Sequence, residues 1–407
     1  MHMGSLNAYP RWTRDAFFLA PQAMSKLRHF NPQDLSNMLW AYAKVGASNP
    51  ALFKASGDSI VALNNLRDFW PQALSNIVWA YATAGETHPR LFTKLADHIA
   101  KLEDLSGFKP QNYSNIVWAY ATAGDSHPLL FKKCADNIVA SDDLNGFNSQ
   151  NLSNFIWAYA TAGESHPRLF KKLADHIVGL DDFSGCKPQE ISNIIWAYAT
   201  VGESHSRLFK KLADQVVELD SLSGFKPQNI ANITWAYATA GESHPLLFRK
   251  LADVAIARCN EFNSQEIANI LWAYATNGQT DLHLYSSFAP TVKSITGKCN
   301  IQEVANIGWA YAVANADAPS LFNYDFVSLC LEKENDFSLE NLCQLHQWQL
   351  WQEELKSNIE LPQSLREKCQ KAFKSTLPTP SHFQVSSCPS CCPLAYIQMK
   401  KSSPKAH

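Results

Sequence analysis

The chain has 407 residues, of which 46% are hydrophobic, so it can form a large buried core. Its 35 basic and 37 acidic side chains leave a net charge of −2, which argues against a protein that recruits nucleic acid or anionic membranes through overall charge. No apolar run reaches the roughly 18 residues of a membrane-spanning helix, and no secretory signal is recognisable. We therefore expect a soluble, intracellular protein with no membrane contact.

The first predicted segment comprises residues 1–30. Four basic residues there outnumber the single acid, Asp15, which is a weak sign of organelle targeting. The apolar spacing from Phe17 to Phe30 equally suits a partial or worn second helix of a repeat. We favour the worn helix.

A unit of 37–39 residues recurs eight times over residues 31–335. A fixed period of this size predicts a solenoid, in which each unit buries its apolar face against its neighbours. A degenerate ninth unit, counted to Trp348, falls within 336–384, and a disordered tail is expected over 385–407. The eight regular units share a tryptophan: Trp40, Trp79, Trp118, Trp157, Trp196, Trp235, Trp272 and Trp309.

Each unit contains two helical patterns. In the first, Pro110 suits the first helical position and Gly124 suits the C-terminal cap. In the second, Ser165 or His166 precedes Pro167, and apolar residues then follow at helical spacing. The sequence predicts an all-α fold, a right-handed superhelical α-solenoid of tandem antiparallel helix pairs.

On a wheel of about 100° per residue, the first helix directs Leu152, Phe155, Ile156 and Tyr159 toward the second helix. The opposite face carries glutamine seven residues before the tryptophan, asparagine three before it and the tryptophan itself. In a stacked array these side chains form ladders along one wall, normally the concave one, with a groove on the order of 80 Å long. The ladder amides are Gln33, Gln72, Gln111, Gln150, Gln189, Gln228, Gln265 and Gln302, with Asn37, Asn76, Asn115, Asn154, Asn193, Asn232, Asn269 and Asn306.

Two interpretations of this wall stay open. The asparagines and tryptophans could hold adjacent repeats together, or they could bind a linear ligand, since amides donate and accept hydrogen bonds and indoles stack on bases. These positions hardly vary, so choice between bases would have to come from the variable position six before the tryptophan, at the edge of the wall. Its predicted contact residues are Asn112, Asn151, Glu190 and Asn229.

No catalytic constellation is recognisable, and we expect neither enzymatic activity nor a cofactor. The second helices pair Lys171 with Asp175 four residues later, which indicates a solvated outer face. The repeated histidines lie too far apart for a shared metal and suit helix capping. Metal binding by Cys388, Cys391 and Cys392 is a weaker alternative to a disordered tail.

The unit PQNLSNFIWAYATAGESHPRLF resembles the octotricopeptide-type repeats of organellar RNA-binding proteins and is similar to the leucine-rich repeats of the FAST-kinase-domain family. The resemblance covers about Asn31 to Gln384, since LCQLHQWQLWQEEL and the segment from Leu361 to Gln384 resemble the lead-in to that family's C-terminal RAP domain. The 23 residues after Gln384 lack the strands and carboxylates of a RAP domain, so we expect that domain to be missing.

The resemblance implies a non-catalytic protein that binds single-stranded organellar RNA in RNA processing, stability or translation, with protein partners in a ribonucleoprotein complex. It implies a mitochondrial location, with the chloroplast as the alternative, in the soluble matrix or stroma. The alternative function is an armadillo-like scaffold that binds an extended peptide, because a groove of amides with near-neutral charge also suits a peptide backbone.

Overall fold

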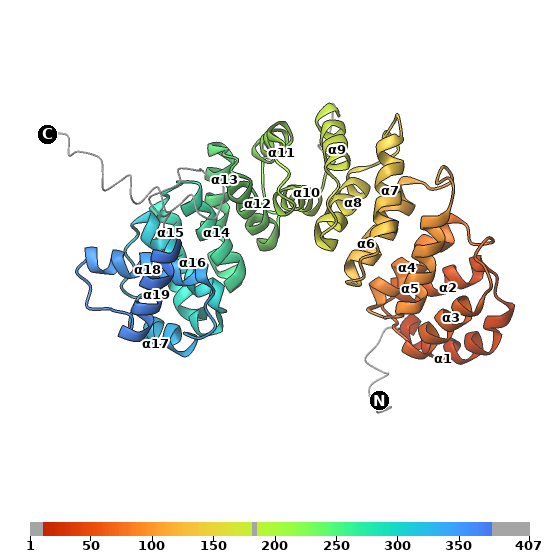
Figure 1. The fold of residues 1–407 in the computed structure, drawn as a ribbon, viewed down its shortest axis with the longest axis horizontal. Helices are drawn as coiled ribbons and strands as arrows, with labels where there is room; N and C mark the ends of the chain where they lie inside the picture. The colour runs from red at the N-terminus through yellow and green to blue at the C-terminus, as the bar shows by residue number, and fades with distance from the viewer. Residues whose placement is uncertain (1–10, 181–184, 377–407) are drawn as a thin grey trace. The chain divides into compact units, whose positions relative to one another are not determined.

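The computed structural model describes residues 11–180 and 185–376. Within these ranges every regular element is a helix, as Figure 1 shows, and the predicted all-α solenoid of helix pairs is confirmed. The chain divides into two compact units, Met1–His205 and Ser206–His407. The predicted tail over 385–407, with its three cysteines, lies outside the described residues.

In the first unit, two kinds of helix alternate along the chain. The helix α1 (Arg11–Lys26) and the short η2 (Leu27–His29) come first, and α1 packs on α3 as the second helix of a preceding repeat would. The first helices of the repeats are α2 (Pro32–Lys44), α4 (Pro71–Ala84), α6 (Pro110–Thr122), α8 (Ser149–Ala162) and α10 (Pro188–Thr200). The second helices are α3 (Pro50–Ala62), α5 (Pro89–Lys101), α7 (Pro128–Ala140) and α9 (Pro167–Gly179).

The second unit continues the alternation and ends in two further helices. It contains α11 (Ser206–Glu218), α12 (Pro227–Ala240), α13 (Pro245–Ala257), η3 (Cys259–Glu261), α14 (Ser264–Thr276), α15 (Leu282–Ile295), η4 (Thr296–Lys298), α16 (Ile301–Ala314), α17 (Tyr324–Glu332), α18 (Leu339–Glu354) and α19 (Gln363–Thr376). Among these, α12, α14 and α16 are first helices, and α18 packs on α16 in the same layer.

The helix ends follow the predicted local chemistry. Pro167 opens α9, and the ring nitrogen Nδ1 of His166 accepts a hydrogen bond from the backbone N–H of Leu169. Gly163 caps α8 at φ +69°, a left-handed conformation that side chains with a Cβ rarely adopt. The same proline, histidine and glycine recur in most repeats, so each hairpin is fixed by residues within it.

The two layers differ in how closely their helices pack. Within each unit, consecutive first helices pack against one another much more extensively than consecutive second helices do. Small side chains permit this approach, since Ala158 and Ala160 on the flanks of α8 are buried between its neighbours. Within each unit the array therefore bends locally toward the first-helix layer.

Tyrosines and phenylalanines tie the layers together at each step between repeats. The tyrosine two residues after each ladder tryptophan from Trp79 to Trp309 is buried, and its hydroxyl donates a hydrogen bond of 2.5–2.7 Å to a backbone carbonyl in the second helix of the preceding repeat. Burial holds the pKa of the Tyr159 hydroxyl well above its ordinary value. The hydroxyl therefore stays a donor across the physiological range.

The cysteines of the described chain behave as small apolar residues. Cys134, Cys186, Cys299, Cys330, Cys343 and Cys369 are buried and unpaired. Burial raises the pKa of the Cys134 thiol to about 12, so it carries no thiolate character at neutral pH.

Candidate functional site

The glutamine, asparagine and tryptophan ladders lie on the surface of the first-helix layer, as predicted. Every ladder glutamine is exposed. Asn37 is exposed, and the next six ladder asparagines, from Asn76 to Asn269, are half-buried. Trp40 is 41% exposed, and the following six tryptophans are half-buried. We call these three ladders, over α2 to α10 in the first unit and over α12 and α14 in the second, the ladder face of each unit.

The ladder asparagines keep their hydrogen-bonding capacity free. Across residues 11–180 and 185–376, the side-chain amides of Asn37 and of the six asparagines from Asn76 to Asn269 make no hydrogen bond to protein. None of these amide atoms is among the buried polar atoms that lack a partner. The amides therefore face solvent, and a ligand can take the place of that water.

Other repeated polar side chains are already committed to contacts between repeats. His127 bonds Asp97 of the preceding second helix at 3.2 Å through Nε2, and equivalent pairs recur at the neighbouring steps. Lys172 donates to the carbonyls of Val139 and Ser141 at the end of α7. Because these ladders hold the repeats together, the asparagine ladder is not needed for that purpose.

From α6 to α12, the variable position six before the tryptophan does not lie on the ladder face, whereas Asp34 of α2 is exposed and Glu266 of α14 is half-buried. Asn112, Asn151, Glu190 and Asn229 are each no more than 9% exposed. The Asn112 side chain accepts from the backbone N–H of Lys109 and donates to Ser75 of the preceding first helix. This position is the third of the helix, where side chains reach back to cap the N-terminus, and that role places it inside the array.

The ladder residues of α16 are covered, although the sequence predicted that they would be accessible to a ligand. Asn306 accepts a hydrogen bond of 2.9 Å from Gln344, and the indole N–H of Trp309 donates one of 2.9 Å to Gln347. Both residues are buried, Trp309 with 2% exposed. The predicted contact residue Asn306 is therefore sealed inside, because α18 covers the face of α16.

The assignment of Trp348 as the ninth ladder tryptophan is wrong. The caps place Ser338 of α18 opposite Asn300 of α16, an offset of 38 residues, so Gln347 is the counterpart of Trp309. Trp348 instead points into the core, fully buried against Phe322 and Phe326. The capping pair Ser338 and Asn341 was the signal that could have revealed this register.

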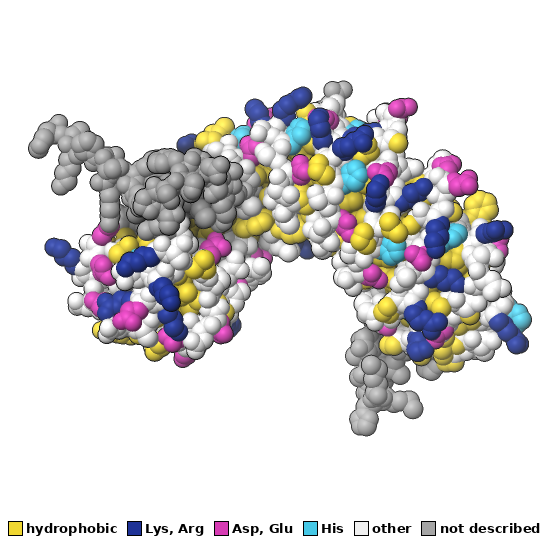
Figure 2. Space-filling model, viewed as in Figure 1, with side chains coloured by type: hydrophobic (Ala, Val, Ile, Leu, Met, Phe, Trp, Pro, Cys, Tyr) yellow, Lys and Arg dark blue, Asp and Glu magenta, His cyan; other side chains and the backbone are white. Residues whose placement is uncertain are grey.

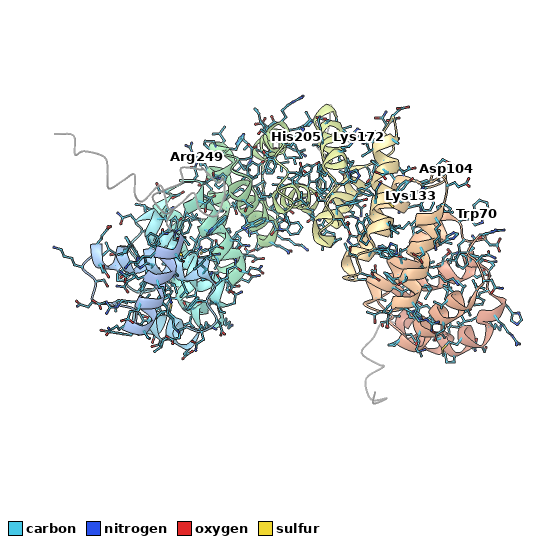
Figure 3. The ribbon with its side chains drawn as sticks, viewed as in Figure 1. Trp70, Asp104, Lys133, Lys172, His205 and Arg249 are labelled. Carbon is cyan, nitrogen blue, oxygen red and sulfur yellow. The ribbon has the colours of Figure 1, made fainter. Side chains whose placement is uncertain are left out.

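Charge is sparse on the ladder face and concentrated on the other layer. Exposed Lys109, Lys187 and Lys226 stand just before the first helices α6, α10 and α12. Figure 2 shows lysines and arginines gathered over α7 and α9, and Figure 3 places Lys133 and Lys172 there. Much of this charge is neutralised or engaged, for example by the predicted pairing of Lys171 with Asp175 at 2.6 Å.

The second-helix side offers an open depression between the linker after α3 and helix α5. It is lined by Arg67, Arg90, Lys94 and Lys101, among others. Lys94 is committed to the carbonyls of the preceding repeat, and Lys101 lies 3.7 Å from Asp97. In the described ranges no three His, Cys, Asp or Glu side chains are placed to hold a metal ion, and none of the helices has the length and hydrophobicity to cross a bilayer.

Residues 68–324, more than half of the chain, match the family described as RNA-editing substrate-binding complex 6 protein. The chain belongs to this family. The matched segment begins in the linker before α4 and ends at the start of α17, so it covers the ladder face from the second repeat onward. No curated protein sequence matches the chain.

Two known structures are similar to the chain at low levels. A pentatricopeptide repeat protein, PPR10, in complex with an 18-nt psaJ RNA element, is 14% identical with a TM-score of 0.33 over 97% of this chain. The chain spans 59% of the length of that protein. A homology model of the full-length AP-3 complex is 10% identical with a TM-score of 0.28, over 90% of this chain and 66% of the other. Both scores are too low to establish a shared fold.

Proposed function

We propose that the chain binds single-stranded RNA along the ladder face and acts without catalysis in RNA processing. The observation that carries this proposal is the run of asparagine amides that have no protein partner in the described residues, while the repeated tyrosine, histidine and lysine side chains are engaged between repeats. The name of the family to which the chain belongs, with its reference to RNA-editing substrates, supports RNA as the ligand.

The chemistry of one repeat suits one or a few nucleotides. The exposed part of each indole offers a surface for a base, and base stacking on aromatic rings contributes about 1–3 kcal/mol per base. The neighbouring asparagine and glutamine amides can donate to and accept from base edges or ribose hydroxyls. Lys109, Lys187 and Lys226 stand where phosphates would pass. Each contact is modest, and affinity comes from their repetition.

The proposal includes a mitochondrial location and protein partners in a ribonucleoprotein complex. Both derive from the resemblance of the repeat to those of organellar RNA-binding proteins. Fractionation of cells that express a tagged chain, followed by identification of co-purifying RNA and protein, tests both points.

A second candidate is a scaffold for an extended peptide. The sparse charge of the ladder face favours it, because amides can pair with a peptide backbone without cationic help. Salt dependence separates the two ligands. With few lysines beside the ladders, RNA affinity should fall with a log–log slope of about −2, at roughly −0.7 per neutralised phosphate, whereas binding of an uncharged peptide should hardly change.

The direct test measures binding of a labelled, unstructured 20-nucleotide RNA by the full chain and by the variant N154A/N193A. We expect the variant to lose about tenfold in affinity, which corresponds to roughly 1.4 kcal/mol, at an unchanged melting temperature. The matched control is N64A/N145A, which removes two exposed asparagine amides from linkers. Unaltered affinity of the ladder variant, or a clear drop in its melting temperature, would contradict the proposal.

A further inference from the structure

We propose that the ladder face responds to the base composition and length of an RNA but not to the order of its bases. This inference rests on the proposed function and specifies the class of RNA. Its basis is that the groups able to touch a ligand are the same on every first helix from α4 to α12, while the variable position beside them is withdrawn into the array on these helices.

The open steps present identical side chains. From α4 to α14, each first helix places an exposed glutamine, a half-buried asparagine and a half-buried tryptophan at the same three positions. Repeat proteins that determine the order of bases do so with side chains that differ from one repeat to the next. Any preference that one step has for a base is therefore shared by the others.

From α6 to α12, the variable position cannot supply the missing differences. Glu190 is 7% exposed, and its carboxylate accepts a hydrogen bond of 3.0 Å from the backbone N–H of Lys187. Asn112 and Asn229 make the same contact in α6 and α12, at 2.9 and 3.0 Å. Asparagine and glutamate can both occupy this position because both cap a helix, so the difference between them carries no information about a ligand.

The remaining exposed variation lies at the helix ends. Lys109, Asn148, Lys187 and Lys226 precede the first helices, where a lysine would contact phosphate, a group common to all nucleotides. Trp70, 77% exposed before α4, is the exception, but it offers a stacking surface that accepts any base.

Equivalent steps also imply equivalent registers. The first unit carries four equivalent first helices, α4 to α10, so an RNA that engages two adjacent helices can bind in three places with nearly equal affinity. The apparent affinity of such a short RNA should then be about three times that of a single site, because equivalent sites add.

The experiment compares labelled 20-nucleotide RNAs of identical composition in three orders, together with homopolymers of the same length. We expect the dissociation constants of the three orders to agree within about twofold, while the homopolymers differ among themselves. A spread of more than tenfold among the three orders would overturn the inference and leave RNA binding intact. Failure of every RNA to bind would instead refute the proposed function itself.

A substitution provides the second arm. Glu190→Asn keeps the cap that Asn112 and Asn229 form naturally and removes a charge from the variable position six residues before Trp196. We expect the ranking of the homopolymers to be the same for E190N as for the natural chain. A changed ranking would show that this position contacts bases, and the inference would fall.

Discussion

The hydroxyl of Tyr159 donates a hydrogen bond of 2.6 Å to the backbone carbonyl of Phe131, which lies in the second helix of the preceding repeat. The two rings meet edge to face, with centroids 5.0 Å apart. One tyrosine thus joins a first helix to the neighbouring repeat by a polar and an aromatic contact. The same pair of residue types recurs at six of the seven such steps, and Tyr285 replaces phenylalanine at the last.

Tyr159→Phe should lower the free energy of unfolding by about 1 kcal/mol, the usual net contribution of a hydrogen bond, because it removes the hydroxyl and keeps the ring. Urea denaturation of the full chain measures this, and RNA affinity should not change. Tyr324→Phe is the control, since Tyr324 is 71% exposed. Equal stability of both variants would show that the buried hydroxyl contributes nothing.

His166→Ala should destabilise by about 0.5–2 kcal/mol, the range for loss of an N-terminal cap, and should also lose the contact of 3.3 Å with Asp136. His166→Asn should recover most of the loss, because Asn49 caps α3 in the same way, accepting from the N–H of Leu52. Thermal unfolding of the three proteins checks this order. If the asparagine and alanine variants have the same melting temperature, capping is not the main role of His166.

Gln347→Ala should destabilise by about 1–3 kcal/mol, because it leaves the buried indole N–H of Trp309 without an acceptor. The fluorescence of Trp309 should also change as its hydrogen bond is lost, although the other tryptophans dilute the signal. Gln370→Ala, at an exposed position of α19, is the control for a lost glutamine. An unaltered denaturation midpoint would mean that water replaces Gln347.

Acid should weaken the contacts between second helices. The hydrogen bond from Lys171 lowers the pKa of Asp175 below its ordinary value of 3.8, and the contact with His205 acts in the same direction. A lowered pKa in the folded state means that the stabilisation is complete above that ordinary value and is lost as the pH falls through the lower one. Asp58, Asp136 and Asp214 behave alike.

These aspartates stay ionised at neutral pH, so their titration should not change the melting temperature there. We expect the melting temperature to fall below about pH 4, where they become protonated. The variant D136N/D175N should show a shallower fall, measured by circular dichroism between pH 3 and pH 7. If the melting temperature of the variant falls as steeply with pH as that of the natural chain, carboxylates other than Asp136 and Asp175 cause the acid destabilisation.

Local chemistry made most of the fold predictable. Proline at helix starts and glycine at helix ends fixed the hairpins, and the apolar period of the first helix separated its core side from the side that bears Asn154 and Trp157. These rules act within one helix and do not depend on the neighbouring repeats. The orientation of the ladders therefore followed from the sequence.

Two predictions failed because capping at the helix ends decides where a side chain points more strongly than its angle on the helical wheel does. Asn112 falls at the edge of the wall by angle alone, but it occupies the third helical position, where the need to cap free backbone N–H groups draws its side chain inward. Trp348 matches the ladder in residue type and in spacing from Trp309, yet the cap at Ser338 sets the register one residue differently. Side-chain identity was the weaker signal in both cases.

The hydrogen bonds that link Asn306 to Gln344 and Trp309 to Gln347 differ from the tyrosine, histidine and lysine contacts used elsewhere. An ordinary repeat contains the residues for all of its contacts with the neighbouring repeats. A duplicated copy therefore fits between two ordinary repeats. The contact between α16 and α18 is different, since it needs glutamines at two positions of α18 where the first helices of the other repeats carry asparagine and tryptophan. Such an array can grow by duplication of an ordinary repeat more readily than by duplication of the step between α16 and α18.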